Sequence, residues 1–464
     1  MNRELLLPTF VTFLNSQGID ARGTVLKLSQ GSVVIEVYNP ESIAQLSEVL
    51  SNFIIYSGET KIYQGRAVVS SLVNTGMALV VTATLVDKFL TQIKTISDLA
   101  DTKKIVRSFI DEWEICNRLN PDYRLIVDQI SSLWGDINHW ISRIESTSDS
   151  RNEIDNISQL DRLLDDVLDV INPELDKLLI EFEEISASLS SSEMDIHKMF
   201  ARKHLHPLML LSPFPHRAIT KPLGYAGDFE TINLLTGRKR IGPTAFAKLI
   251  NEIHLNAEIA VAHKNRIKIL IDYLIQESAR MEFSERQIRI LSVGCGPALE
   301  IQAFLREHSL ADRCHFTLID FEQKALEHVK SRIAEISSDV NRNIKITYIR
   351  QSVQSYIKQA IRNDLDSESP HYDLVYCAGL FDYLSDKISS RLIKLFYQRC
   401  NKGGLVIVTN VHLEHRMRFW MEHALDWYLI YRNEQGMEKL LDKKIDYRIF
   451  TDKTDANIFL ELRK

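Results

Sequence analysis

The sequence predicts a multidomain protein with a small N-terminal β-barrel, a central α-helical region and a C-terminal α/β domain. β-Branched runs separated by turn residues fill the first part, helical periodicity fills the middle, and strands alternate with helices in the last part. We expect the domains to span residues 1–88, 89–205 and 206–464. A chain of 464 residues is long enough for each domain to have its own core.

The barrel is predicted by three β-branched, partly alternating runs at residues 23–39, 60–73 and 75–86. This region resembles a PilZ-like domain, a barrel that binds cyclic di-GMP in many bacterial proteins. The binding pattern of that family has two arginines before the first strand and then a D/N-x-S-x-x-G stretch. Here only Arg22 precedes the strand, and residues 27–31 read KLSQG. The barrel is therefore a degenerate one, and we do not expect it to bind cyclic di-GMP.

The central region is predicted to form several antiparallel helices. Apolar side chains recur at helical spacing between Ile96 and Cys116 and again between Ile157 and Ile171. The pairs Asn120-Pro121 and Asn172-Pro173 each predict a helix start, because asparagine caps a helix and proline needs no donor at the first position. With residues 146–153 as a loop, we expect a structural bundle or dimer surface.

The composition is that of an ordinary folded protein, with 45% hydrophobic and 25% charged residues. A net charge of −6 argues against a nucleic-acid partner, and no run approaches the ~20 apolar residues that span a bilayer. The N-terminus lacks a cationic leader with a cleavage site. The five cysteines are odd in number and have no C-x-x-C spacing, which favours reduced thiols over disulfides or zinc. We therefore expect a cytoplasmic protein with no metal ion and no membrane span.

The C-terminal domain contains one glycine-rich turn typical of nucleotide binding, RILSVGCGPALE at residues 289–300. Its glycines let the backbone approach a ligand without a Cβ in the way, and the next helix contributes its positive N-terminus. Asp320 ends the following strand, where a carboxylate can accept hydrogen bonds from both ribose hydroxyls. The residues P-A-L-E provide no third glycine for a pyrophosphate, which favours a ligand with one ribose and no phosphates.

Residues 245–464 resemble the class I S-adenosylmethionine-dependent methyltransferases, which have a Rossmann-like fold and a first motif that reads G-x-G-x-x-x-E in many members. The resemblance implies S-adenosylmethionine as the cofactor. It also implies where the cofactor-binding residues lie: Gly294 and Gly296 at the methionine part, Asp320 at the ribose, Ser352 and Val353 at the adenine, and Cys377 and Gly379 beside the sulfonium. Cys295, Glu300 and Phe321 complete the expected set. A Rossmann-like domain that binds NAD or no ligand is the alternative.

A second motif, KPLGYAGDFE, stands at residues 221–230. The segment RFWMEHALDWYLIYR, residues 418–432, follows LVIVTN (405–410), the fifth predicted strand of the C-terminal domain. Together they resemble a narrower group of bacterial methyltransferases that make 3-hydroxy fatty-acid methyl esters, the quorum signals of some plant pathogens. That group carries a KP-x-GYAGD-[FY]-E motif and a W-x-x-x-x-x-x-W-x-LIYR-like segment. The resemblance implies methyl transfer to the carboxylate of a small-molecule acid, with a (3-hydroxy) fatty acid as the first candidate.

A carboxylate is already ionised at neutral pH, so it needs hydrogen-bond donors more than a base. Bidentate geometry favours Arg217 over Lys221 as the main donor. We expect three overlapping groups of residues: His216, Arg217, Tyr225 and His412 as catalytic; Arg217, Lys221, Tyr383, Trp420 and Trp427 on the substrate; and Tyr225 and Asp228 on the cofactor, Asp228 at its ammonium group. Residues 419–432 are predicted as an amphipathic helix that either walls a fatty-acyl tunnel or belongs to the core.

Two other functions stay open at this stage. One is methylation of another small-molecule oxygen or nitrogen; methylation of nucleic-acid bases is set aside, because the sequence after the fourth strand reads AGLFDYLSD and not N/D-P-P-Y/F. The other is a non-catalytic, S-adenosylmethionine-binding signalling protein whose barrel senses a ligand or partner. The helical region and the barrel are the candidate homodimer surfaces.

Overall fold

The computed structural model describes residues 9–29, 31–37, 44–57, 60–74, 79–87, 107, 110, 119–147, 153–190, 193–237, 240–281, 286–342, 344–363, 370–441 and 445–464. The chain divides into two compact units. Unit 1 comprises Met1–Ala226, Arg238–Leu255 and Met417–Tyr428; unit 2 comprises Gly227–Gly237, Asn256–Arg416 and Leu429–Lys464. All but residues 107 and 110 of the helix expected between Ile96 and Cys116, and most of the expected 146–153 loop, lie outside the described residues. The domain boundaries at residues 88 and 205 stay predictions.

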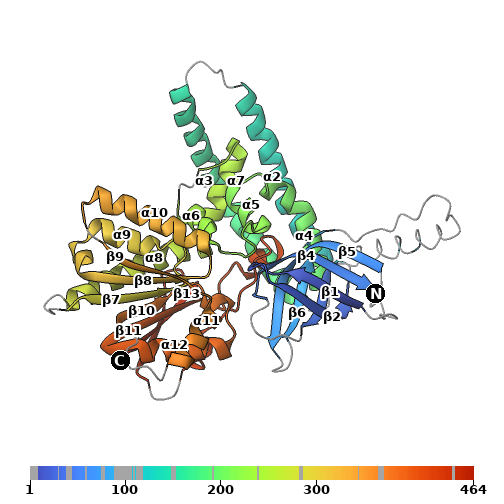
Figure 1. Ribbon diagram of the computed structural model, residues 1–464. Helices are drawn as coiled ribbons and strands as arrows, with labels where there is room; N and C mark the ends of the chain where they lie inside the picture. The colour runs from blue at the N-terminus through green and yellow to red at the C-terminus, as the bar shows by residue number, and fades with distance from the viewer. Residues whose placement is uncertain are drawn as a thin grey trace. The chain divides into compact units, whose positions relative to one another are not determined.

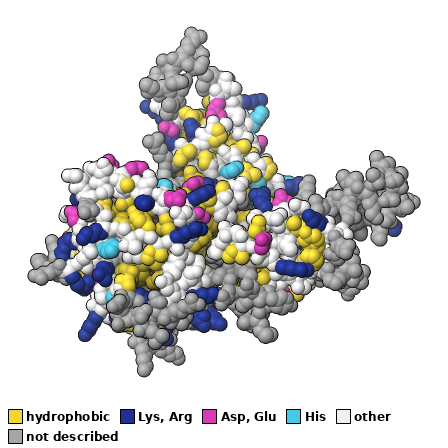
Figure 2. Space-filling view, in the orientation of Figure 1, with side chains coloured by type: hydrophobic (Ala, Val, Ile, Leu, Met, Phe, Trp, Pro, Cys, Tyr) yellow, Lys and Arg dark blue, Asp and Glu magenta, His cyan; other side chains and the backbone are white. Residues whose placement is uncertain are grey.

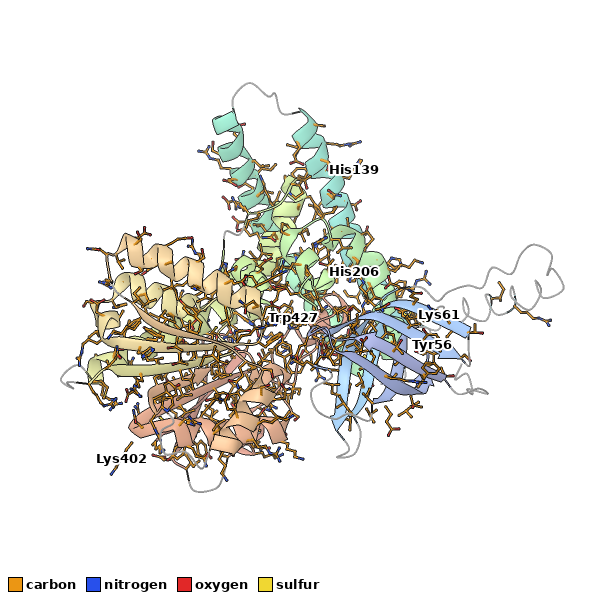
Figure 3. The ribbon with its side chains drawn as sticks, in the orientation of Figure 1. Tyr56, Lys61, His139, His206, Lys402 and Trp427 are labelled. Carbon is orange, nitrogen blue, oxygen red and sulfur yellow. The ribbon has the colours of Figure 1, made fainter. Side chains whose placement is uncertain are left out.

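The predicted barrel is confirmed in unit 1. Its antiparallel strands are β1 (Thr9–Leu14), β2 (Asp20–Leu28), β3 (Ser32–Val37), β4 (Val49–Ser57), β5 (Thr60–Asn74) and β6 (Leu79–Leu85), closed in the order β1-β2-β3-β6-β5-β4 (Figure 1). Phe13 and Phe53 stack inside the barrel with their ring centroids 5.7 Å apart. On the β4–β5 pair, the Lys61 ammonium lies 6.0 Å from the Tyr56 ring centroid (Figure 3). The sequence prediction lacks β1 and β4.

Unit 1 also contains the central helices. They are α2 (Pro121–Thr147), α3 (Glu153–Ser188), α4 (Met194–Met209), α5 (Pro213–Thr220), α7 (Ala245–Asn256, to Leu255) and α13 (Arg418–His423). The predicted start at Asn120 is confirmed, because its Oδ1 accepts hydrogen bonds from the backbone N–H groups of Asp122 and Tyr123. The start predicted at Asn172 is wrong, since α3 continues through Pro173. A proline inside a helix removes one hydrogen bond, which tertiary packing of a 36-residue helix offsets.

The helix predicted over residues 419–432 is also wrong beyond its first turns. The helix α13 ends at His423, and Asp426 adopts a left-handed conformation with φ of 56°. Such a residue interrupts helical geometry, so Trp427 does not continue the apolar face of α13.

Unit 2 is an α/β domain, as predicted. Its sheet strands are β7 (Ile288–Val293), β8 (Cys314–Asp320), β9 (Lys345–Arg350), β10 (Tyr372–Cys377), β11 (Cys400–Val411), β12 (Tyr447–Thr451) and β13 (Asn457–Arg463), in the order β12-β13-β11-β10-β7-β8-β9. The strands β7 to β11 are parallel to their neighbours within that set, and the β12–β13 hairpin closes the sheet antiparallel to β11.

Helices cover both faces of this sheet (Figure 1). They are α6 (Phe229–Thr236), α8 (Glu258–Arg280), α9 (Leu299–Glu307), α10 (Gln323–Asp339), α11 (Val353–Asn363), α12 (Asp386–Arg399) and α14 (Glu434–Glu438), with 3-10 helices η2 (Ser309–Arg313) and η3 (Phe381–Tyr383). One core joins α8, α9 and α10 to one face, and a second joins α12 and α14 to the other. The strand β7 lies between β8 and β10, so the strand order reverses there. Ligands of such sheets bind at the carboxyl ends of the strands at this reversal.

The surface of the described residues is mixed in character. On the face shown in Figure 2, basic and acidic side chains are interspersed with apolar ones. Four apolar side chains on α2 and α3 are exposed: Leu125, Trp140, Val170 and Ile180. The homodimer surface expected in the helical region or the barrel stays a prediction. No helix in the described part of the chain has both the length and the apolar character that crossing a bilayer requires.

Candidate active site

The glycine-rich turn follows β7 at the strand-order reversal. Gly294 and Gly296 have φ of +67° and +50°, the left-handed region that side chains disfavour. The N–H of Gly294 donates to the Ile319 carbonyl at 2.8 Å, which holds the turn against the end of β8. A Cβ on Gly294 would lie 3.2 Å from the Leu380 side chain, whereas one on Gly296 would meet no atom of the described chain within 4 Å. The turn is therefore packed on one side and open on the other.

Asp320, at the end of β8, joins three of the segments predicted to hold the cofactor. Its Oδ2 accepts a hydrogen bond from the Gly296 N–H at 2.9 Å, and its Oδ1 accepts one from the Glu322 N–H at 3.0 Å. Its backbone carbonyl accepts from the N–H of Gln351 at 2.8 Å. Burial raises the pKa of this carboxyl, and the backbone donors act in the opposite direction. Each oxygen keeps a second lone pair that a ribose hydroxyl can use.

The segment expected to border the adenine opens α11. Ser352 precedes this helix and accepts a backbone hydrogen bond from Tyr356 at 2.9 Å, while Val353 is its first residue. Phe321, directly after Asp320, is half-buried. The structure thus gathers the predicted cofactor segments after β7, β8 and β9 at one edge of the sheet.

Glu300 and Cys377 connect the glycine turn to β10. The hydroxyl of Tyr376 donates to Glu300 Oε1 at 2.7 Å, tying α9 to the strand. Burial raises the pKa of the Glu300 carboxyl and also those of the Cys295 and Cys377 thiols. Four cysteines in the described residues are free and buried: Cys295, Cys314, Cys377 and Cys400; Cys116 lies outside the described residues. A buried neutral thiol is a weak nucleophile, so these cysteines act in packing.

Gly379 follows β10 in a left-handed conformation with φ of +89°. A Cβ there would lie 3.1–3.4 Å from the guanidinium of Arg266, which comes from α8. Arg266 is 7% exposed, and its Nη1 has no hydrogen-bond partner among the described residues. The sequence prediction missed Arg266, because an arginine between lysines in an amphipathic helix resembles a solvated residue. The signal that the sequence offers is the spacing of three residues from His263, which places both side chains on one face of the helix, and the structure shows that both are buried.

Two other predicted residues of unit 2 have structural partners. Asp228 is the N-cap of α6, where its Oδ1 accepts hydrogen bonds from the N–H and hydroxyl of Thr231 at 2.7 and 3.0 Å. His412, at the end of β11, has its Nε2 3.6 Å from Glu434 Oε2. Tyr383 lies half-buried in η3. Their expected roles toward the cofactor, the reaction and the substrate stay predictions.

The remaining predicted residues belong to unit 1: His216, Arg217, Lys221, Tyr225, Trp420 and Trp427. His216 is exposed, Arg217 and Tyr225 are partly exposed, and Trp427 is buried. Trp420 is 2% exposed, and it crosses Trp134 and Phe182 edge to face with ring centroids 5.6 Å apart in each case. These contacts give Trp420 a place in the helical core; its part in an acyl pocket stays a prediction.

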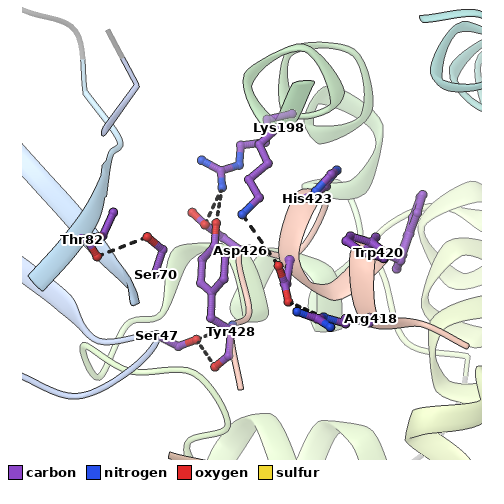
Figure 4. Close-up of polar contacts among 12 residues, drawn as sticks. Ser47, Ser70, Thr82, Lys198, Arg418, Trp420, His423, Asp426 and Tyr428 are labelled. Carbon is purple, nitrogen blue, oxygen red and sulfur yellow. Dashed lines mark hydrogen bonds and ion pairs between the residues drawn. The ribbon is translucent and has the colours of Figure 1, made fainter. Parts of the chain in front are cut away.

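Lys221 is buried near Arg202 and Asp426 of an ionic cluster in unit 1 that the sequence did not predict. Figure 4 shows Lys198, Asp426 and Tyr428 of this cluster. Arg202 pairs with Asp426 at 2.6 Å and donates to the Tyr428 hydroxyl at 3.0 Å, and the Lys198 ammonium lies 4.6 Å from the Tyr428 ring centroid. Lys221 is 3% exposed, and its Nζ has no hydrogen-bond partner among the described residues. Burial lowers the pKa of Lys221 to about 8, with Asp426 opposing the shift and Arg202 adding to it.

The same cluster reaches the barrel and α4. The hydroxyl of Ser47 donates to the Tyr428 carbonyl at 2.8 Å and accepts from its N–H. His206 lies with its Nε2 2.8 Å from the Ala424 carbonyl oxygen (Figure 3). Residues 417–428 are therefore fastened to both the barrel and the helices of unit 1 by buried hydrogen bonds.

We expect Lys221→Met to stabilise the protein at neutral pH. The pKa of Lys221 is about 8 in the folded chain, against 10.5 ordinarily, so the unfolded chain binds more protons between these two pH values. The destabilisation of the folded state by Lys221 is therefore complete below pH 8 and disappears as the pH rises to 10.5. The shift corresponds to about 3 kcal/mol at most. Urea unfolding at pH 7.5 and pH 10 measures it. All five tryptophans lie within the segments of unit 1, so their fluorescence reports on this unit.

In that experiment the gain of the variant over the wild type should shrink as pH rises. The exposed Lys203, changed to methionine on α4, is the matched control and should give no gain at either pH. A Lys221→Met gain of equal size at both pH values would contradict the lowered pKa.

Comparisons with known proteins give one family match and several similar solved structures. A family model described as a methyltransferase domain matches residues 291–406. Among solved structures, a magnesium protoporphyrin IX methyltransferase from Synechocystis PCC 6803 with bound S-adenosylhomocysteine is 12% identical, with 51% of this chain and 93% of that chain covered and a TM-score of 0.35. The N-methyltransferase NodS from Bradyrhizobium japonicum WM9, also with S-adenosylhomocysteine, is 12% identical, with 51% and 97% covered and a TM-score of 0.30. A possible exported protein from Bordetella parapertussis is 18% identical, with 54% and 86% covered and a TM-score of 0.41.

A comparison with curated proteins gives no match. The matched segment begins in β7 and ends in β11, so it contains the glycine turn, Asp320 and the end of β10. These features fit the requirements of the cofactor: an open left-handed turn, a carboxylate for the ribose and, beside Gly379, a buried arginine whose Nη1 has no hydrogen-bond partner in the described part of the chain. The family match and the site agree on one chemistry: residues 291–406 form a methyltransferase domain within an α/β sheet of class I topology, and S-adenosylmethionine is the cofactor that this site fits.

Proposed function

We propose that the protein transfers a methyl group to the carboxylate of a small-molecule acid, with a (3-hydroxy) fatty acid as the first candidate. The observation that carries the proposal is the KPLGYAGDFE stretch, which resembles the fatty-acid methyl ester group in its residues and begins at the left-handed C-cap of α5. Three of its residues are left-handed: Lys221, Gly224 and Gly227 have φ of 45°, 85° and 70°. Left-handed backbone at a lysine is uncommon and costs free energy, and such strain is concentrated at functional sites.

S-adenosylmethionine supplies an electrophilic methyl group when it is bound. The chain's own residues then have three tasks: Asp320 and the glycine turn hold the nucleoside part, cationic donors orient the acceptor oxygen, and apolar walls exclude water. A carboxylate acceptor is ionised at neutral pH, so the site needs no strong base. Arg217 and Lys221 stay our candidate donors in unit 1, with Tyr225 and His216 near them in sequence.

We expect the rate of methyl ester formation from 3-hydroxy acids to rise with chain length from C8 to C16, because burying each added methylene contributes about 0.8 kcal/mol to binding. Mass spectrometry of the products measures the rate for each acid. The matched control is the primary amide of the same acyl chain, which has no carboxylate and should not react. A flat profile would point to a short acid, and methylation of an amine in place of the acid would overturn the proposal.

Arg217→Ala should raise the KM for the acid and leave S-adenosylhomocysteine affinity unchanged, because a bidentate guanidinium acts on the acceptor alone. Arg217→Lys keeps the charge and should recover part of the lost affinity. An unchanged KM in both variants would remove Arg217 from the site.

A further inference from the structure

Arg266 is a buried cation that the described part of the chain does not satisfy. It is 7% exposed, and its Nη1 has no hydrogen-bond partner among the described residues. A buried guanidinium normally forms ion pairs or several hydrogen bonds, because an uncompensated charge in a protein interior is strongly unfavourable. A bound ligand with an anionic group would therefore supply the hydrogen-bond acceptor that this guanidinium lacks.

The surroundings of Arg266 point to the place where that partner binds. The guanidinium lies over the backbone of Gly379, directly after β10, at distances that would leave a Cβ only 3.1–3.4 Å away. The neighbouring residue Leu380 lies where a Cβ on Gly294, in the glycine turn after β7, would be 3.2 Å from its side chain. Arg266 thus stands at the strand-order reversal, between the two strand ends where ligands of such sheets bind.

The nearby carboxyls do not take the place of a ligand. Asp382 uses its Oδ1 to accept the Val411 N–H at 2.6 Å, and Glu300 accepts the Tyr376 hydroxyl at 2.7 Å. Burial lowers the pKa of Arg266, while Asp382 and Glu300 act in the opposite direction. These two carboxyls act on Arg266 through their charge and not through a hydrogen bond. Burial also raises the pKa of Asp382 to about 6. The local charges keep the arginine protonated and leave a donor for a third, incoming carboxylate.

We propose that Arg266 binds the carboxylate of a small molecule above Gly379, as a charge-assisted partner for its unsatisfied guanidinium. Two molecules in this reaction carry such a group: the methionine part of the cofactor and the acceptor acid. The shared chemistry is carboxylate recognition by a planar fork of N–H donors, which lysine reproduces poorly. The acceptor source rests on the proposed function, whereas the cofactor source does not.

Binding measurements on the full chain distinguish the two sources. The variants are Arg266→Met, Arg266→Lys and, as a matched control on the same helix, the exposed Lys268→Met. The probes are S-adenosylhomocysteine, which has the carboxylate, and 5′-methylthioadenosine, which has the same nucleoside and lacks it. A third titration adds 3-hydroxydecanoate to the complex with S-adenosylhomocysteine, and so needs no turnover.

If the cofactor is the source, Arg266→Met should weaken S-adenosylhomocysteine by about 100-fold and leave 5′-methylthioadenosine unchanged, with Arg266→Lys between. If the acceptor is the source, S-adenosylhomocysteine should bind as in the wild type and 3-hydroxydecanoate should weaken by a similar factor. Either result supports the inference. Absence of methyl ester production by the wild type would count against the proposed function and not against these titrations.

The melting temperature without ligand separates a binding arginine from a structural one. A buried charge that lacks a partner is unfavourable in the free protein, so Arg266→Met should melt at the same temperature as the wild type or higher. Equal weakening of both nucleosides with a lower melting temperature would show a structural arginine and overturn the inference. It would also be overturned if all three ligands bind Arg266→Met normally, or if Lys268→Met gives the same losses.

Discussion

Replacing Asp320 by alanine is expected to weaken S-adenosylhomocysteine binding by about 10²–10⁴-fold, because two charge-assisted hydrogen bonds to the ribose are lost at about 1.5–3 kcal/mol each. The carboxylate is 7% exposed and fixed by the N–H groups of Gly296 and Glu322, so it needs no reorganisation when a ligand arrives. Isothermal titration with S-adenosylhomocysteine measures the loss. The variant also removes the anchor of the glycine turn, which adds to the effect.

Asp320→Asn tests whether charge or shape matters. Its amide has one oxygen and one NH2 group, so it cannot accept from both Gly296 and Glu322, and we expect it to bind more weakly than the wild type. The exposed Glu307→Ala, at the end of α9, is the matched carboxylate control and should bind normally. Wild-type affinity in Asp320→Ala would contradict the assignment of the nucleoside site and, with it, the catalytic reading of the domain.

Arg432→Met is expected to destabilise unit 2 by about 3–5 kcal/mol, because it breaks a buried, fully hydrogen-bonded charge. The Arg432 Nη1 donates to the Phe381 carbonyl at 2.9 Å and to Asn410 Oδ1 at 2.5 Å. Its Nη2 donates to the Leu384 carbonyl at 2.6 Å and to Asp386 Oδ1 at 2.8 Å. The guanidinium therefore fastens the η3 turn after β10 to the end of β11, and its loss leaves buried acceptors without donors.

Thermal unfolding followed by circular dichroism measures this effect, and S-adenosylhomocysteine binding at low temperature shows whether the folded fraction keeps its site. Arg432→Lys should recover little, since one ammonium cannot reach acceptors arranged around a planar fork. The exposed Arg448→Met on β12, whose side chain is 68% exposed, should change stability by less than about 0.5 kcal/mol. A melting temperature for Arg432→Met equal to that of the wild type would show that the cluster contributes nothing to the fold.

Local patterns in the sequence were sufficient for the architecture, because they act over a few residues. The alternation of β-branched runs predicts the barrel, and the strand–turn–helix of residues 289–300 with Asp320 predicts the cofactor edge. The capping pair at Asn120 predicts a helix start for the same local reason. The identical pair at Asn172 fails, because the packing of α3 offsets the missing proline N–H. Local chemistry decides an element only where tertiary contacts do not oppose it.

Only the tertiary structure identified the buried charges. Lys221, Arg266 and Arg432 all resemble solvated side chains in sequence, yet they are 3%, 7% and 3% exposed. The reason is that burial and pairing depend on residues far away in the chain. Asp426 interacts with Lys221, more than 200 positions earlier, and Arg266 of α8 lies beside Gly379, which follows β10. The sequence determined the fold class and the cofactor, and the three-dimensional contacts decided which cations are buried and which of them have hydrogen-bond partners among the described residues.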